Sequence, residues 1–403
     1  MVDEERYTMN HSSRNKKEEK PLLLIMVTSS ISMIFFTGQI NYLRQSGFNV
    51  AVVCSPGWDN PDEVPYYPIA MEREISPLKD LISLYKLVIL FWQLRPQIVN
   101  AGTPKAGLLG TIASFLCRIP VRIYTCHGLR LETLTGWKKT VLTLTEKTSA
   151  FCATTVVCVS ESLRRKYIAM QFTNAQKVKI IGNGSCNGID TIKFNSSVAD
   201  KVKARSDLQI KYGIPSDARC IGFVGRLVRD KGIYELLEAF EQLTQKYSDL
   251  YLLLVGGYEE GDPIPVEIRG KIKANEKIVN VGTVTETLPY YRRMDLLVLP
   301  TYREGLPTVL LEAGAMGIPV VATAATGCVD VIVDEETGFL VPIGDSKAIS
   351  EAIDKILRDK VLIDTMGRKA RERVETLFDQ QRVWENAVTF YRDSILYYCR
   401  RLY

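Results

Sequence analysis

Short apolar segments alternate with helical patterns along most of this chain, and the whole alternation occurs twice. The expected strands cover 22–28, 49–54, 97–101, 121–126 and 154–159 in the first half, and 220–225, 252–256, 278–282, 296–300 and 320–323 in the second. These segments are apolar throughout, as are parallel strands covered by helices on both faces of a sheet. The pattern therefore predicts an α/β protein with two doubly wound, Rossmann-like domains.

The helical patterns and the polar segments divide the chain further. Helices are expected near 38–47, 77–95, 104–117, 137–151, 160–170, 232–247, 285–294, 307–316 and 345–376. Residues 1–20 are charged and polar and are predicted to be a disordered tail. An N-terminal domain should cover 21–196, a linker with a short helix 197–216, and a C-terminal domain 217–378. Two such domains in tandem leave a cleft between the carboxyl ends of two sheets, where these folds bind ligands.

The last segment, 379–403, has apolar and aromatic residues at helical spacing. These residues are Val383, Trp384, Ala387, Tyr391, Ile395 and Tyr398. A helix with such a stripe must bury it against another surface. We expect this helix to pack back on the N-terminal domain.

Composition limits the classes of protein that this chain can represent. Of its 403 residues, 46% are hydrophobic and 24% are charged, as expected of a soluble globular protein. No secretory signal precedes the first expected strand, and the nine cysteines include no Cys-x-x-Cys pair. We therefore expect reduced thiols in a cytoplasmic protein. The longest apolar segment, 81–94, contains Lys86 and is too short to span a bilayer.

A basic and aromatic neighbourhood surrounds that apolar segment. It comprises Lys79, Lys86, Phe91, Trp92 and Arg95, and further basic residues follow at Lys138, Lys139, Arg164, Arg165 and Lys166. With a net charge of +5, these residues allow docking on an anionic membrane surface. A buried helix with solvated ends explains segment 81–94 equally well. No nucleic-acid-binding motif accompanies the charge, so nucleic acid is not expected as a partner.

The segment 301–319 carries the strongest functional signal. Glu304 and Glu312 stand on either side of a predicted helix start, with Pro307 suited to its first turn. The amides at a helix N-terminus attract anions, whereas carboxylates accept hydrogen bonds from hydroxyl groups. A ligand with both phosphates and hydroxyls, such as a nucleotide-sugar, satisfies both. The simpler alternative is a capped core helix with one solvated and one paired glutamate.

A second loop, 225–232, follows the first expected strand of the second half. Arg226 and Lys231 leave the end of that strand together, and Gly232 opens the next helix. Two cations at a helix N-terminus suit a diphosphate, because arginine supplies a fork of donors and lysine a point charge. A solvated basic loop would account for Arg229 but poorly for the whole arrangement.

Two positions in the first half are weaker candidates. Gly38 lies between a strand and a helix, where it serves either a ligand-binding loop or simply a tight turn. His127 follows another strand and is the one histidine outside the tail, since the only other is His11. It is either a core histidine or a residue of the cleft. The turn-rich segment 183–190 is either a hinge or part of the cleft lining.

The chain lacks several other functional patterns. With one usable histidine, a transition-metal site is not expected, and no Asp-x-Asp pair is present to hold a divalent metal against a diphosphate. No Walker A sequence appears, so the chain is not a P-loop enzyme. We therefore expect no metal and no cofactor other than the nucleotide-sugar itself.

These motifs resemble those of the retaining family-4 glycosyltransferases of GT-B fold. The resemblance covers the chain from about residue 21 and is strongest over 225–232, 281–283 and 299–342. It implies that the C-terminal domain holds the nucleotide-sugar and that the N-terminal domain holds the acceptor. The donor-site residues implied by it are Gly38, Arg226, Lys231, Gly305, Leu306, Pro307, Thr308 and Glu312, with His127, Glu304, Arg226 and Lys231 catalytic. The glycine loop departs from the family pattern, because Gly38 is followed by Gln39 where the family usually has a second glycine.

In this resemblance Glu304 contacts the donor sugar, Glu312 the ribose, and Arg226 and Lys231 the diphosphate. The segments 35–39, 127–130 and 184–190 look more narrowly like bacterial enzymes that build capsule, O-antigen or lipid-linked oligosaccharides. The implied reaction is retaining transfer of a hexose or N-acetylhexosamine, expected from a UDP-sugar, to an undecaprenyl-diphosphate-linked glycan. The implied location is cytoplasmic, peripheral on the inner face of the plasma membrane.

Two other functions fit parts of the same pattern. A hydrolysing sugar-nucleotide 2-epimerase of GT-B fold would need carboxylates placed for proton abstraction, which the Glu304–Pro307 context does not favour. A non-catalytic nucleotide-sugar-binding scaffold would not need Glu304, Arg226 and Lys231 together. The expected chemistry needs no protein base, because the departing phosphate can accept the proton of the acceptor hydroxyl.

Overall fold

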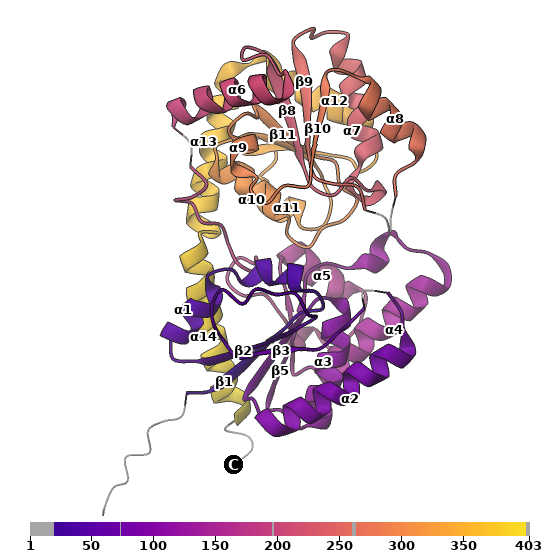
Figure 1. Ribbon diagram of the computed structural model, residues 1–403, viewed down its shortest axis with the longest axis vertical. Helices are drawn as coiled ribbons and strands as arrows, with labels where there is room; N and C mark the ends of the chain where they lie inside the picture. The colour runs from indigo at the N-terminus through magenta and orange to yellow at the C-terminus, as the bar shows by residue number, and fades with distance from the viewer. Residues whose placement is uncertain (1–19, 73, 196, 260–262, 400–403) are drawn as a thin grey trace, which may run out of the picture.

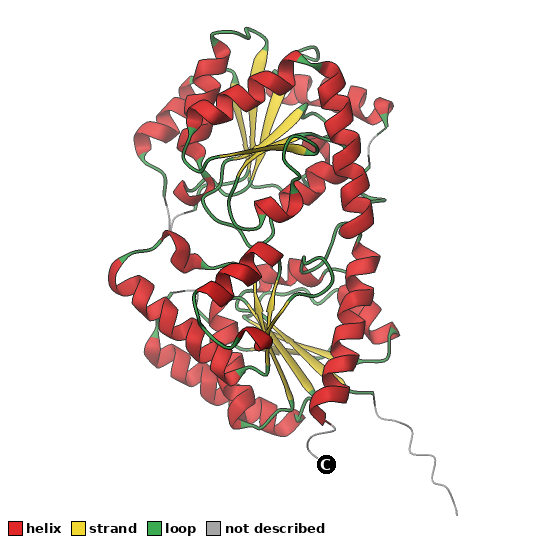
Figure 2. Cartoon of the chain, turned by 180° about the vertical axis from the view of Figure 1, so that it is seen from behind, coloured by secondary structure: helices red, strands yellow, loops and turns green. Residues whose placement is uncertain are grey.

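A computed structural model describes residues 20–72, 74–195, 197–259 and 263–399. The predicted tail, 1–20, therefore lies outside the described residues except for Lys20. Two parallel sheets occupy the two halves of the chain, as the alternating pattern predicted. Figure 2 shows them as separate groups of yellow strands, each enclosed by helices, with a run of helix along one side joining the halves.

The N-terminal sheet has seven parallel strands in the order β3-β2-β1-β4-β5-β6-β7. Their bounds are β1 Leu22–Met26, β2 Asn49–Cys54, β3 Tyr66–Pro68, β4 Ile98–Gly102, β5 Val121–Cys126, β6 Thr155–Cys158 and β7 Val178–Lys179. The edge strands β3 and β7 were not predicted, because at three and two residues they are too short to show a pattern. The first predicted strand, 22–28, ends two residues early, at Met26.

Helices cover both faces of this sheet. Their bounds are α1 Gln39–Gln45, α2 Pro77–Leu94, α3 Pro104–Leu116, α4 Gly136–Cys152 and α5 Glu161–Ala169, with the 3₁₀ turns η1 Ser30–Phe36, η2 Arg130–Thr133 and η3 Ala175–Lys177. In Figure 1, α1 and α14 (Gln380–Cys399) lie on one side of the sheet and α2, α3 and α4 on the other. Separate apolar clusters fill the two sides, as a doubly wound domain requires.

The C-terminal sheet has six parallel strands in the order β10-β9-β8-β11-β12-β13. Their bounds are β8 Arg219–Val224, β9 Leu250–Val255, β10 Ile278–Gly282, β11 Leu296–Leu299, β12 Val320–Thr323 and β13 Gly338–Val341. The helices are α7 Ile233–Thr244, α8 Val266–Ala274, α9 Leu288–Tyr291, α10 Thr308–Ala315, α11 Cys328–Val331, α12 Ser346–Arg358 and α13 Lys360–Leu377, and η4 covers Arg229–Lys231.

Three predictions for the second half differ from the structure. The helix expected over 345–376 is two helices, because Asp359 leaves the helical conformation and its side chain caps α13. The helix expected over 285–294 is the single turn α9. The segment 197–216, expected as a linker with a short helix, is mostly α6, the fifteen-residue helix Val198–Tyr212, whose Leu208 lies in the C-terminal core.

The C-terminal helix packs on the N-terminal domain, as predicted from its aromatic stripe. Val383, Ala387 and Tyr391 are buried, and the Tyr391 hydroxyl accepts a 2.8 Å hydrogen bond from the Asn100 side chain in β4. Trp384 packs against α1. The chain thus crosses back between domains through α13 and α14, which form the long helical run in Figure 2.

Candidate functional site

The loop after β8 places Lys231 beside the end of β11. Gly232, with φ +72°, lies so close to Pro300 that a Cβ atom there would clash with the Pro300 carbonyl oxygen. This close approach brings the Lys231 ammonium into an ion pair with Glu304. Only 18% of the Lys231 side chain and 13% of the Glu304 side chain are exposed. The structure thus joins the two residues that the sequence assigned to the diphosphate and to the donor sugar.

Each charge of this pair is largely shielded from water, and the two side chains hold each other in place. A charge that is shielded from water is costly unless an opposite charge or a hydrogen-bonding group lies beside it, both with and without a bound ligand. A bound diphosphate would supply Lys231 with a second anion, while sugar hydroxyls would donate to Glu304.

Arg226 projects from the same loop but has a different partner. It forms an ion pair with Glu259, which follows β9, and about half of the Arg226 side chain is exposed. The sequence did not single out Glu259, because a lone glutamate beyond a strand carries no pattern of its own. Arg226 and Lys231 therefore share a loop, while each is paired with a carboxylate of a different segment.

Glu312 lies on α10 and accepts a 2.7 Å hydrogen bond from the hydroxyl of the fully buried Tyr291. Burial raises the pKa of Glu312 to about 7, against an ordinary value of 4.5, although the Tyr291 hydrogen bond acts in the opposite direction. Helix α10 begins at Thr308, so Pro307 stands just before it, at the N-cap, rather than in its first turn. The carboxylate of Glu312 is poised to titrate near neutral pH.

His127 lies at the end of β5, and its ring stacks on Phe35 of η1 with centroids 4.8 Å apart. Burial lowers the pKa of His127 to about 4, so the imidazole is neutral at neutral pH. Within the part of the chain that the structure describes, its buried Nε2 has no hydrogen-bond partner. Gly102 makes room for this ring, since a Cβ there would lie 2.7 Å from Nε2.

The main chain beside His127 meets the Glu304 loop of the other domain. A Cβ at Gly305 would clash with the carbonyl oxygen of His127, and one at Gly128 would lie 3.3 Å from the Gly305 nitrogen. Leu306 packs against apolar clusters of both domains. The structure therefore brings His127, Glu304 and Lys231 to one place between the domains.

Gly38 has a different environment from the other candidates. It is the N-cap of α1, with φ +77°, and the three atoms nearest to a Cβ there all belong to Trp384 of α14, the first at 2.7 Å. Packing of the C-terminal helix therefore accounts for the glycine by itself. A role for Gly38 in the donor site stays a prediction.

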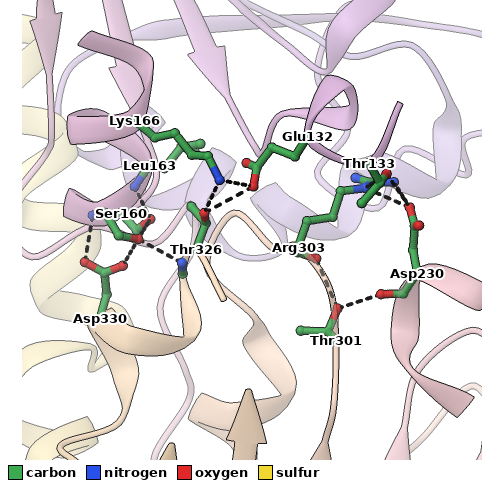
Figure 3. Close-up of polar contacts among 12 residues, drawn as sticks. Glu132, Thr133, Ser160, Leu163, Lys166, Asp230, Thr301, Arg303, Thr326 and Asp330 are labelled. Atoms are coloured by element: carbon green, nitrogen blue, oxygen red, sulfur yellow. Dashed lines mark hydrogen bonds and ion pairs between the residues drawn. The ribbon is translucent and has the colours of Figure 1, made fainter. Parts of the chain in front are cut away.

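A polar network between the domains was missed by sequence reasoning. The hydroxyl of Ser160, at the N-cap of α5, donates a 2.6 Å hydrogen bond to the Gly305 carbonyl oxygen. The carboxylate of Asp330 accepts from the Ser162 amide at 3.0 Å and from its hydroxyl. Figure 3 shows Ser160 and Asp330 facing one another across the interface. Their one sequence signal is that Ser160 and Ser162 directly follow a strand.

The same network continues through η2. Glu132 pairs with Lys166 of α5 and approaches Thr326 of the other domain, which also accepts from Lys166 at 3.2 Å. Thr133 lies 3.2 Å from Asp230, and Arg303 pairs with Asp230 at 2.8 Å (Figure 3). These contacts hold the two domains together around the candidate site.

Three basic residues that the sequence assigned to a membrane surface form ion pairs within the chain, and the membrane surface itself stays a prediction. Arg164 and Arg165 both pair with Glu161 of their own helix, and Lys166 lies in the interface between the domains. In the segment 183–190, Ile189 exchanges backbone hydrogen bonds with Phe378 and Gln380, so this end of the segment is tied to the returning chain between α13 and α14.

Comparison with known proteins connects this geometry to a family. Two family models match the chain, "Glycosyl transferase 4-like domain" over residues 35–184 and "Glycosyl transferases group 1" over residues 204–373. The capsular polysaccharide biosynthesis glycosyltransferase CapM of Staphylococcus aureus is 40% identical over 381 residues, covering 93% of this chain and 97% of that protein. The chain therefore belongs to the family-4 glycosyltransferases.

Other relatives support the same assignment for the enzyme. The UDP-Gal:alpha-D-GlcNAc-diphosphoundecaprenol alpha-1,3-galactosyltransferase of Escherichia coli is 25% identical over 328 residues, covering 80% of this chain and 82% of that protein. These relatives favour a transferase over the 2-epimerase and the scaffold.

Solved structures confirm the GT-B fold of this glycosyltransferase. HepE of Anabaena, in complex with UDP and glucose, has a TM-score of 0.76 and 20% identity, covering 92% of this chain and 99% of that one. Sucrose-phosphate synthase of Thermosynechococcus elongatus has a TM-score of 0.77 and 23% identity, covering 93% and 98%.

The described part of the enzyme holds neither a cluster of metal-ligating side chains nor a helix suited to span a membrane. Among residues 20–72, 74–195, 197–259 and 263–399, no three His, Cys, Asp or Glu side chains form a group that could hold a metal ion. Within those same ranges, no helix combines the length and the apolar character that crossing a membrane demands.

Proposed function

We propose that this glycosyltransferase transfers a hexose or N-acetylhexosamine from a UDP-sugar, with retention of configuration, to a lipid-linked glycan in surface polysaccharide synthesis. One observation carries the proposal: Glu304, which forms a shielded pair with Lys231, lies on a loop whose main chain meets that of His127, and the buried Nε2 of His127 has no partner among the described residues. A cation, a carboxylate that can accept hydrogen bonds from hydroxyl groups, and a neutral imidazole thus lie near one another, where we infer that a sugar diphosphate binds.

In the proposed reaction the bond between the sugar anomeric carbon and the diphosphate oxygen breaks. A bond to the acceptor oxygen forms on the same face, and the acceptor proton passes to the departing phosphate. Lys231 and Arg226 would stabilise the charge that develops on that phosphate, since fixed cations act most strongly where charge increases. The neutral His127 would hydrogen-bond to the donor sugar, and Glu304 would orient it. Glu312 would bind the ribose.

Two fixed cations on one loop would take the place of a divalent metal, so the proposal includes metal independence. The UDP donor is supported by HepE, whose structures hold UDP and UDP-glucose. The acceptor is supported by the E. coli relative, which by name acts on a diphosphoundecaprenol-linked sugar, and the pathway by CapM. A lipid-linked acceptor would place the enzyme at the inner face of the plasma membrane.

The test is transfer of radiolabelled sugar from a panel of UDP-hexoses and UDP-N-acetylhexosamines to polyprenyl-diphosphate-linked acceptors. We expect one donor to be used, with a product of α configuration by NMR. Glu304→Gln should abolish turnover, whereas Glu241→Gln, a change of an exposed glutamate on α7, should not. Release of the free 2-epimer of the sugar, or UDP-sugar binding without turnover on any acceptor, would overturn the proposal.

A further inference from the structure

Helix α2 carries an apolar stripe on its outer side. The residues on it are Leu78, Leu81, Ile82, Tyr85, Ile89 and Trp92, all exposed. At 3.6 residues per turn these positions share one side of the helix. Leu78 is 78% exposed and Trp92 67%, whereas Phe91, on the inner side, is fully buried. The outer side thus presents a continuous apolar surface, which no other part of the described chain covers.

The stripe extends onto the two neighbouring helices. Trp137, Leu144 and Phe151 are seven residues apart on α4, so they share one side of it, and all three are exposed. Phe115, at the end of α3, contacts Phe151 with ring centroids 5.8 Å apart. Figure 1 shows α2, α3 and α4 together at the lower right of the N-terminal domain. We call the exposed apolar side chains of these three helices the outer layer.

The charges on the three helices of the outer layer are mostly positive. The acidic residues of α2, α3 and α4 are Asp80, which pairs with Lys105, and the buried Glu146. The exposed lysines beside the stripes are Lys79 and Lys86 on α2, and Lys138, Lys139 and Lys147 on α4. Lys79 and Lys86 lie seven residues apart along one edge of the α2 stripe, and Lys79 also pairs with Glu72.

A hollow at the end of α2 adds two further cations. Its volume is about 260 Å³, and Trp92, Arg95 and Arg118 are among the residues that line it. The Arg95 guanidinium stands 5.8 Å from the Trp92 ring centroid. At the surface of a bilayer, an aromatic ring can lie among the acyl chains while a neighbouring guanidinium binds the lipid phosphates.

We propose that the outer layer docks this enzyme on an anionic bilayer, with α2 lying in the membrane plane and its apolar stripe inserted among the lipids. Charge complementarity selects the occupant, because an apolar surface edged mainly by cations suits anionic headgroups above acyl chains. The C-terminal domain differs from this pattern, because its exposed apolar side chains Ile210, Val266 and Val361 lie on three separate helices and do not share one helix side.

The orientation of the helices gives this docking a use. In parallel sheets each helix that follows a strand begins at the carboxyl end of that strand, here the end facing the other domain. Helices α2 and α4 therefore begin beside the cleft and run away from it. A docked outer layer holds the cleft at the membrane surface, within reach of a lipid-linked acceptor. This use rests on the proposed function, whereas membrane docking itself does not.

The first test is co-sedimentation of the full chain with phosphatidylcholine vesicles, with and without phosphatidylglycerol. We expect binding that rises with phosphatidylglycerol and persists in part at high salt, because insertion is not screened. Leu81→Ser/Tyr85→Ser/Trp92→Ser should weaken binding by about a hundredfold, and Lys79→Glu/Lys86→Glu by about fivefold per lysine at low salt. The control, Ile210→Ser/Val266→Ser/Val361→Ser, should bind as the wild type does.

The second test measures insertion directly. The sequence has four tryptophans, of which Trp92 and Trp137 belong to the outer layer and Trp384 packs inside the fold. Lipids brominated on their acyl chains should quench the wild type, and Trp92→Phe/Trp137→Phe should remove that quenching. An unchanged melting temperature in every variant shows that the fold is intact.

Several results would overturn the proposal. They are equal binding by the serine variant and its control, absence of acyl-chain quenching, or a wild-type dimer that the serine variant dissociates while no vesicle binding occurs. Failure of the proposed function is separate: it would appear as missing transfer to every acceptor while vesicle binding is intact.

Discussion

Replacing Glu312 by glutamine should make the protein more stable at alkaline pH while weakening nucleotide binding. The pKa of Glu312 is about 7 in the folded chain, against 4.5 for an ordinary glutamate. Below pH 4.5 Glu312 is protonated in both the folded and the unfolded chain, so its burial costs no charge. Between pH 4.5 and pH 7 the unfolded chain loses this proton more readily than the folded chain does, and the free energy of unfolding falls. The loss amounts to about 3 kcal/mol above pH 7. Glutamine avoids it and can still accept the Tyr291 hydrogen bond.

We therefore expect Glu312→Gln to raise the free energy of unfolding by about 2 kcal/mol at pH 8, since relaxation reduces the full figure, and to change it little at pH 5. Urea denaturation at both pH values measures the difference. Calorimetry should show UDP binding weaker by about 1.5–3 kcal/mol at pH 8, because a charged acceptor is lost. In the wild type, UDP affinity should fall as pH drops below 7, when Glu312 is protonated.

Glu146 provides a matched control in the other domain. Burial raises its pKa to about 7 as well, and it accepts a 2.9 Å hydrogen bond from Tyr124. Glu146→Gln should give a similar gain in stability at pH 8 but leave UDP binding unchanged. A stability difference for Glu312→Gln that is the same at pH 5 and pH 8 would refute the titration argument. Equal UDP affinity of both variants would refute the ribose assignment.

Three further predictions follow from the site. Lys231→Ala and Arg226→Ala should each lower kcat/KM by an amount equivalent to about 2–4 kcal/mol, while Lys271→Ala, a change of an exposed lysine on α8, leaves it unchanged; wild-type kinetics in either variant would contradict the diphosphate assignment. Activity should persist in excess EDTA, and a complete loss that added metal restores would show the need for a divalent ion. Asp330→Ala removes the hydrogen bonds from Ser162 that join the two domains. The domains should therefore separate more often, and small-angle scattering should show a larger radius of gyration for the variant than for the wild type.

The order of apolar segments and helical patterns along the sequence was sufficient to predict most of the fold. Uniformly apolar strands separated by helices predict parallel, covered sheets, because only a strand buried on both faces needs an apolar side chain at every position. Strands β2, β5, β10 and β12 have the bounds predicted from sequence. The two-residue strand β7 was missed, since two residues in extended conformation show no period.

The sequence identified the residues of the candidate site one loop at a time. Lys231 and Glu304 stood out because each follows a strand, where parallel sheets gather ligand-binding groups. Their ion pair could not be predicted, since 73 residues separate them and only the close approach of Gly232 to Pro300 brings them together. The environment of Gly38 was equally hidden, because Trp384 lies at the far end of the chain.

The apolar segment 81–94 shows the same division most clearly. Its sequence determined that a helix with basic and aromatic residues would form, but not which side faces the core, since apolar residues occur all around it. The tertiary structure decided that Phe91 lies inside and Trp92 outside, and that Lys166 joins the domains rather than a membrane surface. Local sequence sets the period of a helix, whereas burial depends on what the rest of the chain packs against it.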